Sequence, residues 1–317
     1  MRLPIQFLLA GAMLSALTAT GCGSLSPIAR WERTSLFQPD KYPAGEWAQT
    51  TVLVQDAAFA AADGTKLHGW YARRPQPKAH ALVLHGNAGN VTLLADSLRI
   101  LNHRHGLSVL ALDYRGYGRS EGTPSEQGVL QDARAARKWL AQKEGIAERD
   151  VVLMGQSLGG GVAIDLAAND GCRGLVVAGT FTSVPDVAQH HVSWLPMRWL
   201  LSTKFDSLTK IKQYQGPLLL AHGDADEVVP YQQGLKLFEA APGPKKMITN
   251  FGGKHNDPLP EEYRVALDDF LAHLPPLEAD MPDAADRLRA AMPGSSQQQP
   301  AYSQQLLASQ PDGRELP

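Results

Sequence analysis

One stretch decides the fold of this chain: Val151-Val152-Leu153-Met154-Gly155-Gln156-Ser157-Leu158-Gly159-Gly160. An apolar run typical of a buried strand ends at Gly155, and small residues at helical spacing follow the serine. The pattern Gly-x-Ser-x-Gly between a strand and a helix is a nucleophile elbow, in which a sharp turn strains the serine backbone. Glycines flank Ser157 because side chains there would clash. We predict that Ser157 is a nucleophile and that the amide of Leu158, at a helix N-terminus, donates to an oxyanion.

The composition is that of an ordinary globular protein. The chain has 317 residues, of which 44% are hydrophobic and 20% are charged, and its net charge is -2. This length suits one large α/β domain or two small ones. A nucleic-acid-binding protein would carry a basic patch or stripe, so we expect no nucleic-acid partner.

The N-terminal residues have the pattern of an export signal. Residues 1–21 carry one charge, Arg2, followed by an apolar stretch from Ile5 to Ala19. The stretch ends in Leu17-Thr18-Ala19-Thr20-Gly21-Cys22. This ending resembles a bacterial lipobox, which implies cleavage of the signal peptide before Cys22 and a membrane-anchored lipoprotein of the cell envelope. The alternatives are a plain signal peptide that releases a soluble protein and an uncleaved membrane anchor.

Three further segments follow the signal peptide. Residues 22–47 are expected to form the lipidated cysteine and a tether, although the aromatic residues within it suggest that Leu36-Phe37-Gln38-Pro39 packs on the domain. Residues 48–274 form the globular domain. Residues 275–317 are rich in Pro, Ala and Gln and are expected to form a largely disordered tail.

Within the domain, short apolar runs alternate with helical stretches. Two strands joined by a turn are expected at Thr51–Ala60 and Thr65–Ala72. Further strands are expected at Ala81–Leu84, Ser108–Leu112, Val151–Met154, Leu175–Ala178, Leu218–Ala221 and Lys246–Asn250. Helices are expected at about Thr92–His103, Ser125–Lys143, Leu158–Ala168, Tyr231–Glu239 and Glu261–His273. This alternation predicts a mostly parallel sheet with helices on both faces.

In such a sheet the ligand lies beyond the carboxyl ends of the strands, so the residues that follow each run matter most. The Gly-rich turn His85–Asn90 offers the amide of Asn87, or that of Ala88, as a second oxyanion donor, and His85 itself is expected to be structural. The turn Asp113–Gly122 is expected to brace loops, with Ser120 as a decoy nucleophile.

The last two strand ends supply the partners of the serine. After Leu218–Ala221, three carboxylates compete to orient a histidine: Asp224, Asp226 and Glu227. After Lys246–Asn250, His255 stands on a Gly-rich loop and follows both other candidates in the chain. The order of serine, acid and histidine suits a hydrolytic triad in which His255 is the base.

These motifs together resemble the α/β-hydrolase superfamily, and most of all its small serine hydrolases of the lysophospholipase or serine-aminopeptidase type. The resemblance runs from about Phe37 to Leu274. It implies the α/β-hydrolase fold with a short helical cap, the catalytic set Ser157, Asp226 and His255, and no cofactor or metal. It places the acid on Asp226 by the pattern His-Gly-x-x-Asp-x-x-Val-Pro.

The substrate is expected to be a small-molecule or lipid ester. A long insertion at about 181–216, the expected cap, is rich in Trp and Leu. These side chains either line an apolar pocket for lipophilic acyl groups or simply pack the cap onto the domain. One alternative is a peptidase or amidase of the same fold, for which Asp186 or Asp206 would bind the substrate amine. Another is a non-catalytic envelope lipoprotein.

Overall fold

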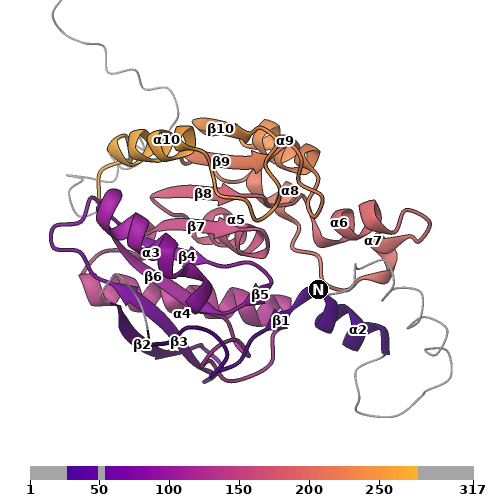
Figure 1. Cartoon of the computed structure of the whole chain (residues 1–317), viewed down its shortest axis with the longest axis horizontal. Helices are drawn as coiled ribbons and strands as arrows, with labels where there is room; N and C mark the ends of the chain where they lie inside the picture. Colours follow the sequence, from indigo (N-terminus) through magenta and orange to yellow (C-terminus); the bar gives the residue numbers. More distant parts are fainter. Residues whose placement is uncertain (1–26, 49–53, 278–317) are drawn as a thin grey trace, which may run out of the picture.

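The computed structural model describes residues 27–48 and 54–277, and its core is one eight-stranded sheet (Figure 1). The strand order is β10-β9-β8-β7-β4-β6-β3-β2. The strands are β2 (Gln55–Ala60), β3 (Lys66–Ala72), β4 (Ala79–Leu84), β6 (Leu107–Asp113), β7 (Val152–Gln156), β8 (Gly174–Ala178), β9 (Leu218–Gly223) and β10 (Lys245–Asn250). From β6 to β10 all neighbours are parallel, whereas β3 pairs antiparallel with both β2 and β6. The predicted mostly parallel sheet is confirmed.

Helices cover both faces of the sheet because its buried strands alternate side chains between two cores. On β4, Leu82 and Leu84 belong to one apolar cluster, while Ala81 and Val83 belong to the other. The first face carries α4 (Glu126–Glu144), α5 (Leu158–Asp170), α8 (Ser207–Ile211) and α9 (Tyr231–Ala240). The second carries α3 (Ala95–Arg99), with the flanking turns η1 (Val91–Leu94) and η2 (Ile100–Arg104), and α10 (Glu261–Ala272).

Capping residues explain where α4 begins and ends. Ser125, predicted as the first residue of a helix, is the N-cap of α4, and its side chain accepts from the amide of Gly128. Gly145 ends this helix in the left-handed conformation. The helix predicted at Thr92–His103 is instead a succession of η1, α3 and η2.

The cap leaves the sheet after β8. It contains α6 (Val184–His191) and α7 (Met197–Leu200) and ends before α8. Its buried side chains Val192, Met197 and Leu201 join the core on the first face. The apolar residues of the cap therefore largely pack it onto the domain.

The segment 27–48 is more ordered than a tether. It forms α2 (Pro27–Leu36) and β1 (Gln38–Pro39), which pairs with β5 (Ala88–Gly89), and Phe37 is buried in the core as expected. The carboxylate of Glu32 is buried and accepts from the amides of Ser202 and Thr203. Burial opposes ionisation, but these hydrogen bonds outweigh it and lower the pKa of Glu32. The contacts attach α2 to the cap. The predicted signal peptide, the predicted lipidation site Cys22 and residues 278–317 of the predicted tail lie outside the described residues.

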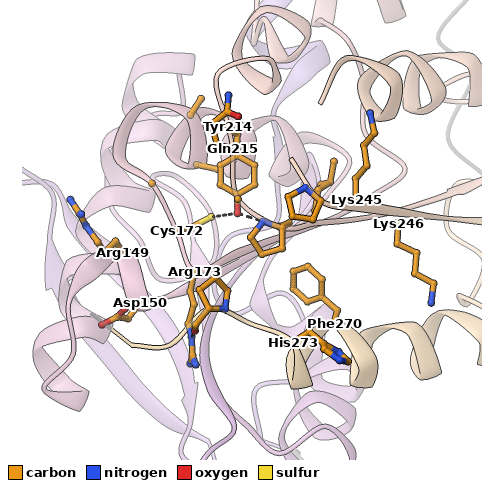
Figure 2. A pocket seen from close by; sticks show the side chains of 18 of the residues that line it. Arg149, Asp150, Cys172, Arg173, Tyr214, Gln215, Lys245, Lys246, Phe270 and His273 are labelled. Atoms are coloured by element: carbon orange, nitrogen blue, oxygen red, sulfur yellow. Dashed lines mark hydrogen bonds between the residues drawn. The ribbon is translucent and has the colours of Figure 1, made fainter. Parts of the chain in front are cut away.

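A cavity of about 770 Å³ lies at the amino ends of β7, β8, β9 and β10 (Figure 2). Cys172 lines it and donates from its thiol to the hydroxyl of Tyr214 at 3.4 Å. Burial raises the pKa of the Cys172 thiol to about 12. The nucleophilic form of cysteine is the thiolate, so this cysteine is structural. The cavity is at the opposite end of the sheet from the elbow.

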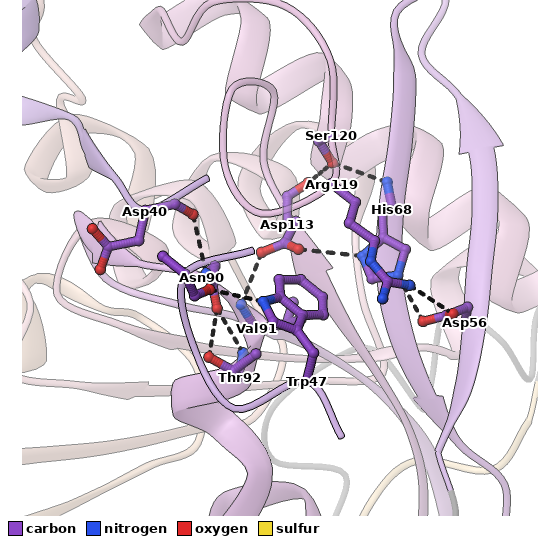
Figure 3. A network of polar contacts seen from close by, with 11 residues as sticks. Asp40, Trp47, Asp56, His68, Asn90, Val91, Thr92, Asp113, Arg119 and Ser120 are labelled. Carbon is purple, nitrogen blue, oxygen red and sulfur yellow. Dashed lines mark hydrogen bonds and ion pairs between the residues drawn. The ribbon is translucent and has the colours of Figure 1, made fainter. Parts of the chain in front are cut away.

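A polar network fastens the N-terminal segment to the sheet (Figure 3). The carboxylate of Asp113 is fully buried, accepts from the amide of Val91 at 2.8 Å, and lies 3.2 Å from Nδ1 of His68. The hydroxyl of Ser120 donates to the carbonyl of Asp113 and accepts from the amide of His68. Arg119 stacks on the ring of Trp47 at 4.7 Å. The predicted bracing role of this turn is confirmed, and the Ser120 hydroxyl is used in it.

Candidate active site

Ser157 forms the junction between β7 and α5 with φ of 52° and ψ of -117°. Few residues other than glycine adopt this conformation, and it costs about 1–3 kcal/mol. Its neighbours explain the glycines: a side chain on Gly155 would overlap the backbone of Gly159, and one on Gly159 would overlap the carbonyl of Leu84. The serine backbone is held by its amide, which donates to Ala178, and by its carbonyl, which accepts from Thr180. The predicted elbow is therefore present as a strained and tightly enclosed turn.

The loops after β9 and β10 bring Asp226 and His255 together. Nδ1 of His255 donates to Oδ2 of Asp226 at 2.7 Å. The other carboxylate oxygen, Oδ1, accepts from the amides of Val228 and Val229 at 2.9 and 2.8 Å. Because a carboxylate only accepts, the proton of the histidine ring is held on Nδ1 and Nε2 is left to act as a base.

The carboxylate of Asp226 is maintained in its ionised form. Burial acts to raise its pKa, but hydrogen bonds from His222 and His255 outweigh burial and hold the pKa well below the ordinary 3.8. The ionised carboxylate therefore adds stability that is fully present above pH 3.8 and is lost as the pH falls through the lowered folded value. The sequence interpretation missed His222, whose Nε2 lies 3.3 Å from Oδ2. His222 could have been found from the sequence, because it is the first residue of the pattern His-Gly-x-x-Asp-x-x-Val-Pro that places the acid on Asp226.

The other two competing carboxylates have different contacts. Asp224 is exposed, and its Oδ1 accepts from the amide of Gly252. Glu227 is exposed and lies 3.9 Å from Nζ of Lys254. Of the three candidates, Asp226 is the one that the structure places on His255.

The turn after β4 lies beside the serine. A side chain on Gly86 would lie 3.7 Å from Cβ of Ser157. Within the described part of the chain, the amides of Asn87 and Leu158 donate to no protein acceptor, so both are available to an oxyanion. Ala88, the alternative donor, is aligned with Gln38, but the hydrogen bonds between these strands go to the carbonyls of Asn87 and Gly89, so both registers of the second donor stay open.

Two tyrosines of the Asp113–Gly122 turn hold this loop from behind. The hydroxyl of Tyr117 donates to the carbonyl of Asn87 at 2.7 Å, and that of Tyr114 donates to the carbonyl of His85 at 3.0 Å. The ring of His85 is buried against both tyrosines, as expected for a structural histidine. The sequence predicted that this turn braces loops, but not that it braces the loop carrying Asn87.

Ser157 and His255 both lie beside the end of β8. The amide of Ser157 donates to Ala178 at 3.0 Å, and a side chain on the next residue, Gly179, would lie 3.5 Å from the ring of His255. Among the described residues, the Ser157 hydroxyl makes no hydrogen bond to His255. Such contacts commonly tighten only when substrate binds.

Comparison with known proteins places this site in a family. A family model described as serine aminopeptidase, S33, matches residues 75–210. An uncharacterised protein of Mycobacterium tuberculosis is 36% identical over 255 residues, which cover 80% of this chain and 90% of that protein. The α/β-hydrolase domain-containing protein WAV2 of Arabidopsis thaliana is 30% identical over 230 residues, which cover 66% of this chain and 75% of that protein. The chain belongs to the α/β-hydrolase superfamily. The esterase Pf2001 of Pyrococcus furiosus shares the fold with a TM-score of 0.62 at 19% identity, covering 75% of this chain and 97% of that chain.

A cavity of about 610 Å³ adjoins the site of this hydrolase. It is lined by Gln156, Asp226 and His255 and also by apolar side chains of η1, η2 and α10. No described residue of 181–216 lines it. Of the two alternatives for the cap residues, lining an apolar pocket does not apply to this cavity, and Trp194 and Trp199 are 73% and 90% exposed.

The described residues contain no group of three or more His, Cys, Asp or Glu side chains that could hold a metal ion. The groups gathered at the carboxyl end of the sheet are the Ser157 hydroxyl, the His255 imidazole, the Asp226 carboxylate and the two backbone amides of Asn87 and Leu158. These are the components of acyl transfer.

The Tyr117 hydroxyl is expected to position the amide of Asn87. In Tyr117→Phe, the Asn87 carbonyl keeps only the hydrogen bond from the amide of Gln38, so residue 87 is held less firmly and its amide can turn away. We expect kcat for an ester to fall about tenfold with KM nearly unchanged, because the oxyanion forms only in the transition state. Steady-state kinetics measure both constants, and Tyr42→Phe, at an exposed tyrosine, is the matched control. An equal rise in KM would argue against positioning.

Proposed function

We propose that this hydrolase is a serine esterase that cleaves carboxylic esters, with a preference for lipophilic acyl groups, through Ser157, His255 and Asp226. The observation that carries the proposal is the 2.7 Å hydrogen bond from Nδ1 of His255 to Asp226, beside a serine strained at φ of 52°. Strain of this kind is retained where the surrounding structure serves a function.

The proposed reaction follows from these contacts. Nε2 of His255 takes the proton of the Ser157 hydroxyl as its oxygen attacks the ester carbonyl, and Asp226 stabilises the resulting imidazolium. The carbonyl oxygen becomes an oxyanion and accepts from the amides of Asn87 and Leu158. The imidazolium returns its proton to the leaving alcohol, which leaves an acyl-enzyme on Ser157. Water then attacks the acyl group with His255 again as the base.

The contacts of the cap acids favour an ester over an aminopeptidase substrate. An aminopeptidase needs a carboxylate to bind the substrate amine. Asp186 accepts from Thr182 and forms an ion pair with Arg198 at 2.7 Å. Asp206 caps α8 by accepting from the amide of Thr209. Both predicted candidates therefore already have structural partners.

A fluorophosphonate probe tests the serine hydrolase assignment. The probe phosphonylates a serine only when a neighbouring base activates it. We expect one labelled band from the wild-type chain, none from Ser157→Ala, and unchanged labelling of Ser120→Ala. Absence of labelling in the wild-type chain would favour the non-catalytic alternative. A panel of p-nitrophenyl esters and aminoacyl p-nitroanilides then separates esterase from peptidase activity.

We also propose that the chain is a bacterial lipoprotein anchored through Cys22, with the signal peptide removed. The support is the apolar stretch that ends in Leu17-Thr18-Ala19-Thr20-Gly21-Cys22. In the described part of the chain, no helix is both long and apolar enough to span a bilayer.

Thiol counting tests the anchor. The chain has two cysteines, Cys22 and Cys172. With a pKa of about 12, the Cys172 thiol is expected to stay unreactive toward Ellman's reagent in the native protein at pH 8. After denaturation we expect one reactive thiol if Cys22 carries a lipid. Two reactive thiols in the denatured mature protein would contradict lipidation. In the matched control Cys172→Ala, we expect no reactive thiol after denaturation.

A further inference from the structure

The cap exposes two tryptophans at the junction of α6 and α7. Trp194 is 73% and Trp199 is 90% exposed, although tryptophan is among the residues with most to gain from burial. Their neighbours Met197 and Leu201 are buried and hold the segment against the domain. The tryptophans are therefore presented outward by a packed cap.

The N-terminal segment reaches the same region. Glu32 binds the backbone of Ser202 and Thr203, so α2 is fixed against the chain that follows α7, and these helices lie together at the right of Figure 1. Cys22 precedes Pro27, the first residue of α2, by five residues. A chain of that length spans at most about 18 Å. A lipid on Cys22 would therefore hold this region close to the bilayer.

The charge of this region is complementary to anionic lipids. Residues 27–36 and 192–204 contain four cations, Arg30, Arg33, Arg198 and Lys204, and one acid, Glu32. Arg198 forms an ion pair with Asp186 of α6, so the excess positive charge rests on the other three cations. The carboxylate of Glu32 is buried and already satisfied by its hydrogen bonds. Exposed tryptophan among basic residues is the composition of a membrane-interface surface.

We propose that residues 27–36 and 192–204 form a lipid-docking surface that inserts Trp194 and Trp199 into the interface of an anionic bilayer. The proposal rests on the proposed function only in using the Cys22 anchor to bring the chain to the membrane. The cap leaves the carboxyl end of β8, and Nε2 of His191 on α6 bonds the carbonyl of Val228, close to Asp226. Docking therefore turns the catalytic end of the sheet toward the lipid.

Tryptophan quenching by brominated lipids tests the docking. The full chain is reconstituted in vesicles of equal parts phosphatidylcholine and phosphatidylglycerol with brominated acyl chains. We expect strong quenching in the wild-type chain and loss of most of it in the double variant Trp194→Ser/Trp199→Ser. In Trp139→Phe, on α4 against Tyr71, we expect no loss.

The outcomes separate docking from catalysis and from anchoring. Hydrolysis of a soluble p-nitrophenyl ester is expected to be unchanged in the double variant, while hydrolysis of a vesicle-borne ester falls about tenfold, as loss of two buried aromatic anchors predicts. Unchanged quenching in the double variant, or no quenching of a wild-type chain that floats with the vesicles, would overturn the docking surface. Absence of ester hydrolysis with quenching intact would contradict the esterase and leave docking standing. A wild-type chain that does not float with the vesicles would contradict both the anchor and the docking.

Discussion

Replacement of Ser157 by alanine is expected to lower kcat for p-nitrophenyl butyrate by about 10⁴-fold or more. Among the residues that the structure describes, this hydroxyl is the group placed to form the acyl-enzyme, while the two proposed oxyanion amides and the cavity remain. Alanine keeps the strained backbone of the elbow, so the thermal unfolding temperature should change little. Stopped-assay kinetics and a thermal melt measure the two effects separately.

Ser120→Ala is the matched control for this prediction. Ser120 is also a serine in a Gly-rich turn after a strand, but its hydroxyl donates to Asp113 and accepts from His68. We expect it to lose about 1 kcal/mol of stability and to keep its activity. Near wild-type turnover in Ser157→Ala, or a larger loss in Ser120→Ala, would contradict the assignment of the nucleophile.

The elbow, the positions of the strands along the chain and the positions of the site residues were predictable because they depend on local patterns. Buried parallel strands appear as apolar runs, and Gly155 and Gly159 are required by close backbone approach. The ends of β7, β9 and β10 meet at one edge of the sheet, so residues that follow those runs converge. The sequence pattern alone therefore locates Ser157 and His255.

The acid and the cap were harder to predict, each for a physical reason. Three carboxylates lie within four positions after β9, and the turn geometry that selects one of them depends on long-range contacts. The cap tryptophans show the same limit: apolar composition predicts burial or a pocket lining, but it does not say which side chains of a short helix face outward. The hydrogen bond from Tyr117 to the Asn87 carbonyl was not predicted, because the two residues lie in turns that are far apart in the sequence.

Asp226→Asn is expected to lower kcat by about 10⁴-fold, whereas Asp224→Asn should change it less than about threefold. The amides of Val228 and Val229 both point at Oδ1 of residue 226 and will select the oxygen of the new amide group.

This choice places the amide nitrogen of the asparagine against Nδ1 of His255, where the carboxylate oxygen stood. An N–H donor there forces the proton of the ring onto Nε2, so the base can no longer accept from Ser157. At residue 224 the asparagine oxygen can still accept from Gly252, and no contact to His255 is lost. Steady-state kinetics on both variants decide between the two acids: a far larger loss at Asp224 would show that it, and not Asp226, orients the histidine.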